Sequence, residues 1–104
     1  MHPAVTNGSY DVSRIRADFP ALALNVYGKP LVYLDNAASA QKPKQVLDRL
    51  QKAYTAEYAN VHRGLHYLAN EATEAYEGAR ETVRTFLNAG RKEEIIFTAT
   101  PPRR

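Results

Sequence analysis

The chain contains no cysteine and no tryptophan, and only one of its 104 residues is methionine. The lack of cysteine excludes a disulfide framework, a thiolate metal site and a cysteine nucleophile within these residues. No apolar run approaches the roughly 20 residues that cross a bilayer, and the first residues lack the apolar stretch of a secretory signal. We therefore expect a cytoplasmic protein without membrane contact.

The positive charge is modest and dispersed. The net charge is +3, from 14 lysines and arginines against 11 acidic residues. A nucleic-acid-binding surface gathers its basic residues into a patch or stripe, whereas here they are scattered along the whole chain. Because the apolar and charged fractions, 44 % and 24 %, are ordinary for a globular protein, the composition predicts one small domain and no nucleic-acid partner.

Hydrophobic periodicity predicts three helices. Residues 1–10 are polar and are expected to be a flexible lead-in to the first helix, which Asp11 caps and which ends at Phe19, before Pro20. The second helix is expected over residues 43–59, and the third from residue 65 or 68 to residue 88. Gly90 is the expected left-handed cap at the end of the third helix.

Two short apolar runs predict strands. Leu31–Leu34 follows an expected turn at residues 28–30, and Ile95–Thr98 follows two glutamates. Both runs are rich in the β-branched and aromatic residues that favour strands. Together with the helices, they predict a mostly helical α/β chain.

The loop at residues 35–43 (DNAASAQKP) is the first candidate site. Loops at the carboxyl ends of strands gather ligands in α/β enzymes, and the small side chains of Ala37 and Ala38 would let a ligand approach the backbone. A plain strand-to-helix connection capped by Ser39 explains the same residues. Judged by residue types alone, the plain connection is favoured.

The second candidate is the segment His62-Arg63-Gly64-Leu65-His66. Two histidines four residues apart could share a helix face and bind zinc, but Gly64 lies between them and no third ligand is evident. An anion-binding or subunit-contact role for Arg63 fits better, since arginine recognises carboxylates through a planar fork of donors. The third helix carries a series of glutamates with two arginines nearby, and this series indicates a solvated face. The residues are Glu71, Glu74, Glu77, Glu81, Arg80 and Arg84.

In their order along the chain, four motifs closely resemble the N-terminal region of type II cysteine desulfurases, the SufS and CsdA group of the class V aminotransferase superfamily. The motifs are YLDNAASAQKP, NVHRGLHYLAN, EATEAYEGAR and EEIIFT, and IRADFPAL resembles the opening helix of the same proteins. The resemblance covers residues 13–98, or 11–98 with the helix cap, and the tail 99–104 diverges. It implies a single partial domain, residues 1–104, that forms the N-terminal fragment of a fold type I pyridoxal-phosphate-dependent transferase.

The resemblance also implies an activity and partners. Such enzymes are homodimers that use pyridoxal 5'-phosphate to convert L-cysteine to L-alanine. They leave a persulfide whose sulfur passes to an acceptor protein of iron–sulfur cluster assembly. By position in the motifs, one loop would line the substrate pocket and a second would approach the active site and the dimer interface. The residues of these two loops are Asn36, Ala37 and Ala38 in the first, and His62, Arg63 and His66 in the second.

The end of the chain departs from the family. Residues 101–104 (PPRR) stand where the family has a helix that binds the cofactor phosphate at its N-terminus. The histidine that stacks on the cofactor, the aspartate for its pyridine nitrogen, the Schiff-base lysine and the persulfide cysteine have no counterpart. We therefore expect a truncated or frameshifted desulfurase that is inactive alone. The alternative hypothesis is a stand-alone helical module that binds a full-length desulfurase subunit.

Overall fold

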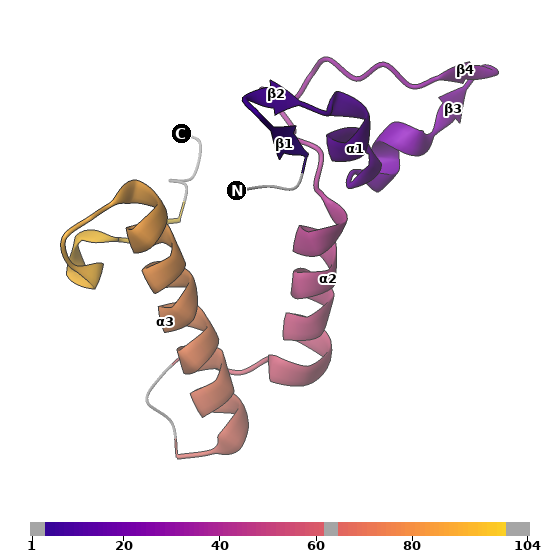
Figure 1. Cartoon of the computed structure of the whole chain (residues 1–104). Coiled ribbons are helices and arrows are strands. Elements are labelled where there is room, and N and C mark those ends of the chain that lie inside the picture. Colours follow the sequence, from indigo (N-terminus) through magenta and orange to yellow (C-terminus); the bar gives the residue numbers. More distant parts are fainter. Residues whose placement is uncertain (1–3, 62–64, 100–104) are drawn as a thin grey trace, which may run out of the picture. The chain divides into compact units, whose positions relative to one another are not determined.

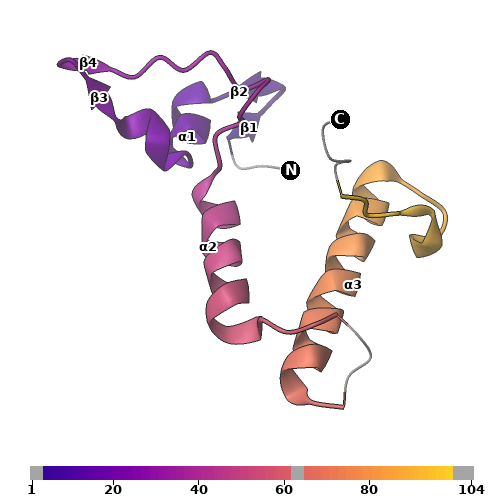
Figure 2. The same ribbon diagram turned by 180° about the vertical axis from the view of Figure 1, so that it is seen from behind.

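The computed structural model describes residues 4–61 and 65–99. These residues belong to two compact units, Met1–Lys52 and Ala53–Arg104. The first unit carries four two-residue strands and two α-helices, and the second is built around one long α-helix (Figures 1 and 2). The prediction of a mostly helical chain with short strands is confirmed in this coarse form.

The described part of the predicted lead-in forms a β-hairpin. Strand β1 (Val5–Thr6) pairs antiparallel with β2 (Ser9–Tyr10). Asn7 (φ 51°) and Gly8 (φ 77°) make the turn between them. A two-residue turn with both residues at positive φ matches the twist of the flanking strands, and Asn-Gly favours it. The flexibility of this region stays a prediction, but its Asn-Gly signal was missed.

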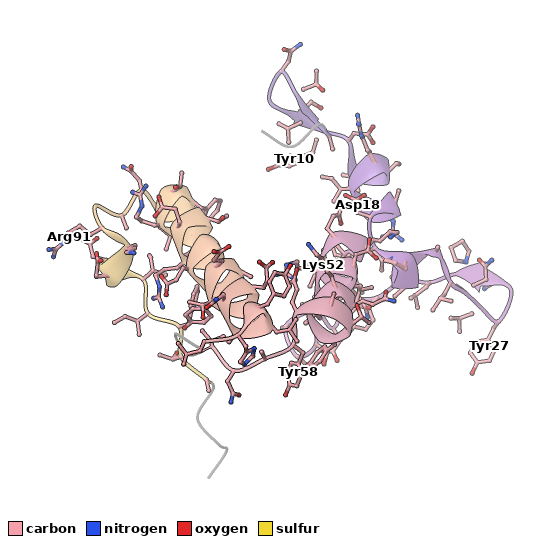
Figure 3. All side chains as sticks on the ribbon, turned by 90° about the horizontal axis from the view of Figure 1, so that it is seen from below. Tyr10, Asp18, Tyr27, Lys52, Tyr58 and Arg91 are labelled. Carbon is pink, nitrogen blue, oxygen red and sulfur yellow. The ribbon has the colours of Figure 1, made fainter. Side chains whose placement is uncertain are left out.

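A second hairpin follows the same design. Strand β3 (Asn25–Val26) pairs antiparallel with β4 (Lys29–Pro30) across Tyr27 (φ 51°) and Gly28 (φ 75°). Tyr27 projects from the hairpin tip and is 99 % exposed (Figure 3). The turn is therefore at residues 27–28, slightly before the predicted 28–30. Pro30 fits a strand here because every strand of a two-stranded hairpin is an edge, where a missing N–H is tolerated.

Helix α1 (Val12–Ala17) begins as predicted at Asp11. The Asp11 carboxylate accepts a hydrogen bond from the Arg14 backbone N–H at 3.0 Å, which is the N-cap contact. The helix ends at Ala17 with Asp18 as its C-cap, two residues before the predicted Phe19, and Pro20 opens a 3-10 helix (Pro20–Ala23). Proline at the first helical position lacks only an N–H that would have no helical partner.

Helix α2 (Lys44–Lys52) starts directly after Pro43. The Lys44 backbone N–H donates to the Asp18 carbonyl at 2.7 Å, so the start of α2 is tied to the end of α1. A π-helical turn (Ala53–Glu57) follows. The helical span therefore ends two residues before the predicted residue 59, and its last turn is wider than an α-helix.

Helix α3 (Tyr67–Leu87) is the main element of the second unit. It ends at Asn88, whose left-handed backbone (φ 55°, ψ 36°) directs its N–H to the carbonyls of Arg84 and Thr85. The prediction of Gly90 as the left-handed cap is therefore wrong. Asparagine tolerates this conformation and precedes Gly90 in the chain. The helix itself ends at Leu87, next to the predicted end at residue 88, so the error concerns the cap residue alone. A 3-10 helix (Lys92–Glu94) follows.

Both strand predictions are wrong for this structure, because no β-ladder in the described residues includes Leu31–Leu34 or Ile95–Thr98. The two-residue alternation of a strand is nevertheless present. Val32 and Leu34 are exposed, whereas Leu31 and Tyr33 are half-buried. Ile96 is likewise 77 % exposed beside Ile95 at 8 %. The sequence therefore encodes the strand pattern, while the neighbouring strand that would complete a ladder is missing from the described part.

Few side chains are fully covered. Among the described residues only Ala4, Ala69 and Ile95 are buried, and no polar or charged residue is. Large apolar side chains remain exposed on α2 and on both strand-like runs. Within the described helices, none combines the length and apolar content needed to cross a bilayer.

Candidate functional site

The loop after Leu34 is held by Tyr33, which lies just before it in the chain. The Tyr33 hydroxyl lies 2.7 Å from the carbonyl oxygen of Ser39 and 3.3 Å from that of Asp35, to which it donates. The Ser39 backbone N–H in turn donates to the Asp35 carbonyl at 3.1 Å and closes a tight turn. One tyrosine therefore fixes the two ends of this turn.

Asn36 braces the same loop from within. Its side-chain oxygen Oδ1 accepts a hydrogen bond from the Gln41 backbone N–H at 3.1 Å. An Asn side chain that bonds to nearby backbone in this way stabilises a turn. Ala37 and Ala38 occupy the turn itself and are exposed. The loop thus presents two methyl-sized side chains on a braced backbone.

Sequence reasoning selected Asn36, Ala37 and Ala38 but missed Tyr33. Its signal was the polar end of a tyrosine within an otherwise apolar run, because a buried or half-buried tyrosine hydroxyl usually finds a partner. The structure brings the three selected residues together in one turn. It assigns Asn36 a bracing role and leaves the two alanines facing outward.

The second candidate loop is described only in part. His62 and Arg63 lie outside the described residues. His66 is the N-cap of α3, with its ring nitrogen Nδ1 accepting a hydrogen bond from the Ala69 backbone N–H at 3.3 Å. That nitrogen is therefore engaged in starting the helix. Within residues 4–61 and 65–99 no three acidic or histidine side chains group into a metal site.

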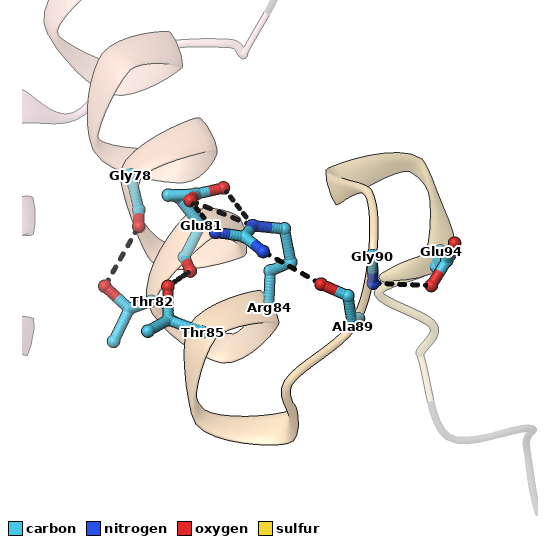
Figure 4. Close-up of polar contacts among 8 residues, drawn as sticks. All are labelled: Gly78, Glu81, Thr82, Arg84, Thr85, Ala89, Gly90 and Glu94. Carbon is cyan, nitrogen blue, oxygen red and sulfur yellow. Dashed lines mark hydrogen bonds and ion pairs between the residues drawn. The ribbon is translucent and has the colours of Figure 1, made fainter.

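Glutamates and arginines form ion pairs along α3, but the face predicted to be solvated is only partly so, because the side chains of Arg80 and Arg84 are 18 % and 29 % exposed. Arg80 lies 3.3 Å from Glu77, three residues before it. Arg84 lies 2.6 Å from Glu81, also three residues before it (Figure 4). The hydrogen bond from Arg84 lowers the pKa of Glu81 below its usual range, and the same contact raises the pKa of Arg84. Arg84 also donates to the Ala89 carbonyl at 2.8 Å, so it ties the charged face to the residues after the helix.

The first unit contains an open hollow of about 700 Å³. Its walls come from the first hairpin, α1 and the start of α2, and the lining residues are Val5, Tyr10, Ile15, Asp18, Phe19, Pro43 and Gln45. The lining is mainly apolar and includes no residue of the Asn36–Ser39 turn. The hollow and the candidate turn therefore share no residue, although Pro43 and Gln45 of the hollow follow the turn closely in the chain.

Comparison with known proteins decides the family. The Aminotransferase class-V family model matches residues 32–101, which include the candidate loop, α3 and the segment after it. The chain belongs to the class-V aminotransferase family. The match therefore covers most of the chain and every motif that carried the resemblance except the opening helix.

Curated class-V relatives are cysteine desulfurases by name. The "Cysteine desulfurase" of Pectobacterium atrosepticum is 57% identical over 89 residues, which are 86% of this chain and 22% of the relative. The "Probable cysteine desulfurase" of Streptomyces coelicolor is 56% identical over 92 residues, 88% of this chain and 22% of the relative. The "Cysteine desulfurase" of Synechococcus elongatus is 52% identical over 88 residues, 85% of this chain and 14% of the relative. The chain thus spans about a fifth or less of the length of these relatives.

The class-V family implies pyridoxal phosphate as cofactor, and the described residues do not fit it. The cofactor is held as a Schiff base on a lysine in a framework that fixes its ring. All five lysines here are exposed, and two of them point to local partners: Lys42 to the Ala40 carbonyl at 2.7 Å and Lys44 to the Asp48 carboxylate at 2.5 Å. We therefore derive no chemical step through the cofactor from these residues.

Proposed function

We propose that this chain is the N-terminal portion of a type II (SufS-like) cysteine desulfurase. In the whole enzyme, L-cysteine is converted to L-alanine and the sulfur is passed to an acceptor protein of iron–sulfur cluster assembly. The whole enzyme is proposed to be a cytoplasmic homodimer with pyridoxal 5'-phosphate as cofactor. The 104 residues alone are proposed to be inactive.

The observation that carries this proposal is the identity of more than half of the aligned residues with proteins named cysteine desulfurase. The candidate loop supports it. A substrate pocket needs a backbone of fixed shape with small side chains facing the ligand, and Tyr33 and Asn36 brace a turn whose outward residues are Ala37 and Ala38. In this proposal the turn shapes one wall of the cysteine pocket, and it neither donates nor accepts a proton.

His66 has a separate part in the proposal. It starts α3 by accepting the Ala69 N–H, and thereby fixes where the preceding loop meets the helix. His62 and Arg63 of that loop are proposed to contact the substrate carboxylate or the partner subunit. Arginine suits a carboxylate because its planar fork of donors matches the two oxygens.

A chimera tests the proposal without requiring this chain to act alone. The matching 89-residue region of the Pectobacterium atrosepticum cysteine desulfurase is replaced by the corresponding residues of this chain, and alanine release from L-cysteine is measured. We expect an active chimera, because the braced loop and α3 replace their counterparts. A chimera that folds and binds pyridoxal phosphate yet releases no alanine would contradict the proposal.

Two variants of the chimera locate the effect. Ala38→Phe places a large side chain on the outward face of the turn and is expected to raise KM for L-cysteine at least tenfold while the cofactor stays bound. Glu74→Gln, on an exposed position of α3, is the matched control and is expected to leave KM unchanged. If KM for L-cysteine changed equally in the two variants, the loop would not line the pocket.

The alternative function is a helical module that binds a full-length desulfurase subunit. The observation that favours it is the partly exposed apolar stripe of α2, formed by Val46 (42 % exposed), Leu47 (41 %) and Leu50 (50 %). A module of this kind is expected to co-purify with a full-length relative and to lose that association in Leu47→Glu. The chimera distinguishes the two functions, since a module that only binds has no reason to restore catalysis.

A further inference from the structure

The segment Ile95–Phe97 contacts α3 although it belongs to no β-ladder among the described residues. Ile95 is only 8 % exposed, while Ile96 is 77 % exposed. The backbone of an extended segment is normally held by hydrogen bonds to a neighbouring strand. Here the Ile95 carbonyl accepts its hydrogen bond from a side chain instead, the guanidinium of Arg80.

Arg80 makes several contacts at once. Its Nη1 donates to the Ile95 carbonyl, and its Nε donates to the Glu77 carboxylate at 3.3 Å. Its guanidinium carbon lies 5.2 Å from the centre of the Tyr76 ring and 5.1 Å from that of Phe97. The Arg80 side chain is only 18 % exposed, so these contacts are partly shielded from water. Cation–π attraction is stronger when the partners are shielded in this way.

The two rings also contact each other directly. Tyr76 and Phe97 have centroids 5.2 Å apart and an interplanar angle of 74°, an edge-to-face pair. Such pairs add about 0.5–1.5 kcal/mol beyond the area that they bury. Tyr76 and Arg80 lie one turn apart on α3, so a single face of the helix binds both the backbone and the side chain of the segment.

In the described part of the chain, no arginine–aromatic cluster of this kind contacts the other strand-like run. Leu31–Leu34 also lacks a ladder, and its Leu34 side chain is 90 % exposed. The Leu31 backbone N–H donates to the Leu24 carbonyl at 2.9 Å, which extends the second hairpin. Arg80 and the two rings therefore accompany the one fully buried residue of the two runs, Ile95, whereas Leu31 and Tyr33 are only half-buried.

We propose that Arg80, Tyr76 and Phe97 form a clasp that holds Ile95–Phe97 extended on α3 before any strand pairs with it. The clasp is a conformational device. It fixes which side chain faces the helix, Ile95, and which faces away, Ile96. Contacts with α3 therefore determine which side chains of this run face the helix. A strand that pairs with the run later would bind a segment that is already extended.

Backbone order parameters from nitrogen-15 relaxation test the clasp on the 104-residue chain. They report motion on the picosecond–nanosecond scale, with values of about 0.85 for rigid backbone and below about 0.6 for flexible backbone. We expect residues 95–97 to be rigid in the natural sequence and to fall below about 0.6 in Arg80→Gln. The glutamine retains a polar end but lacks the planar cation that contacts both rings.

Arg84→Gln is the matched control. Arg84 is on the same helix, pairs with a glutamate three residues before it, and donates to a carbonyl after the helix, that of Ala89. Its guanidinium bonds to Glu81 and Ala89 rather than to residues 95–97, so the order parameters of residues 95–97 are expected to stay unchanged. Equal loosening of residues 95–97 in both variants would contradict the clasp, because it would reflect a general loss of helix charge pairing.

Phe97→Leu gives an independent measurement that leaves α3 unaltered. It removes both the cation–π contact and the edge-to-face contact, and we expect residues 95–97 to become flexible while α3 stays rigid. If Arg80→Gln lowers the order parameters of α3 as well, Phe97→Leu alone tests whether the clasp holds residues 95–97. Rigid residues 95–97 in Phe97→Leu, or a flexible segment in the natural sequence, would overturn the proposal.

Discussion

Tyr33 shows how a single hydroxyl can determine the shape of a loop. In Tyr33→Phe the carbonyls of Ser39 and Asp35 lose their shared donor, while the ring that supports them remains. A hydrogen bond of this kind contributes about 1 kcal/mol, which is about a fivefold change in an opening equilibrium. We expect the Ser39 amide to exchange with solvent about five times faster, measured by hydrogen exchange.

Tyr27→Phe is the control for this loss of a hydroxyl. Tyr27 lies at the tip of the second hairpin and is 99 % exposed, so removing its hydroxyl is expected to leave Ser39 exchange unchanged. An unchanged Ser39 amide in Tyr33→Phe would show that the turn is held by its backbone and by Asn36 alone.

The ion pair of Glu81 and Arg84 predicts a pH dependence in α3. The hydrogen bond from Arg84 lowers the pKa of Glu81 in the folded chain below its usual 4.5. The contribution of the pair to stability is therefore fully present above about pH 4.5 and is lost as the pH falls through the lowered pKa. It is small, because the pair is exposed.

Glu81→Gln removes this dependence. We expect the helix content of the natural chain, followed by circular dichroism, to exceed that of the variant at pH 7 and to converge with it at pH 2. Glu74→Gln on the same helix is the control and is expected to leave the pH profile unchanged. A difference between Glu81→Gln and the natural chain that grows as the pH falls would contradict this assignment.

At the scale of elements, the end of α3 depends on the left-handed backbone of Asn88. Residues with a Cβ pay about 1–2 kcal/mol in this conformation, and asparagine and glycine are the usual exceptions. We therefore expect Asn88→Ala to destabilise α3 by about 1 kcal/mol and Asn88→Gly to be nearly neutral, measured by thermal unfolding of the helix signal.

Gly90→Ala provides the opposing test. Gly90 is not at positive φ, and an added Cβ would meet the Glu94 carboxylate at 3.5 Å, an ordinary contact. We expect this substitution to be nearly neutral. If Gly90→Ala were more destabilising than Asn88→Ala, the left-handed cap would belong to Gly90 after all.

The elements differ in how far the sequence predicts them. The cap at Asp11, the helices and the charged face of α3 follow from local rules, because a helix satisfies its own hydrogen bonds. The runs at Leu31–Leu34 and Ile95–Thr98 carry the alternation of strands, but a strand also needs a neighbour. Local pattern therefore predicted the alternation in these runs and could not predict pairing.

The hairpins and the candidate site show a second limit. Asn7-Gly8 is a strong local hairpin signal, but the polar composition of residues 1–10 by itself predicts a flexible lead-in. The roles of Tyr33 and His66 depend on where a hydroxyl and a ring nitrogen reach in space, and periodicity contains no such information. The family resemblance selected the loop at Asn36–Ala38, whereas only the structure shows what braces it.

At the scale of the whole molecule, the chain corresponds to about a fifth of its cysteine desulfurase relatives. It has two compact units with few buried side chains and many exposed apolar ones. Exposed apolar surface of this extent is typical of surfaces that other parts of a protein or a partner cover. The proposed function requires those other parts of the protein, because they would also supply the cofactor-binding framework that the described residues lack.

Titration of the purified chain with pyridoxal 5'-phosphate, followed by borohydride reduction and mass spectrometry, tests this account most directly. The account predicts no saturable binding and, after reduction, only weak labelling spread over several of the five exposed lysines. A control titration with pyridoxal, which lacks the phosphate, should give the same pattern. Saturable, phosphate-dependent labelling at one lysine would contradict it, since these residues would then hold the cofactor by themselves.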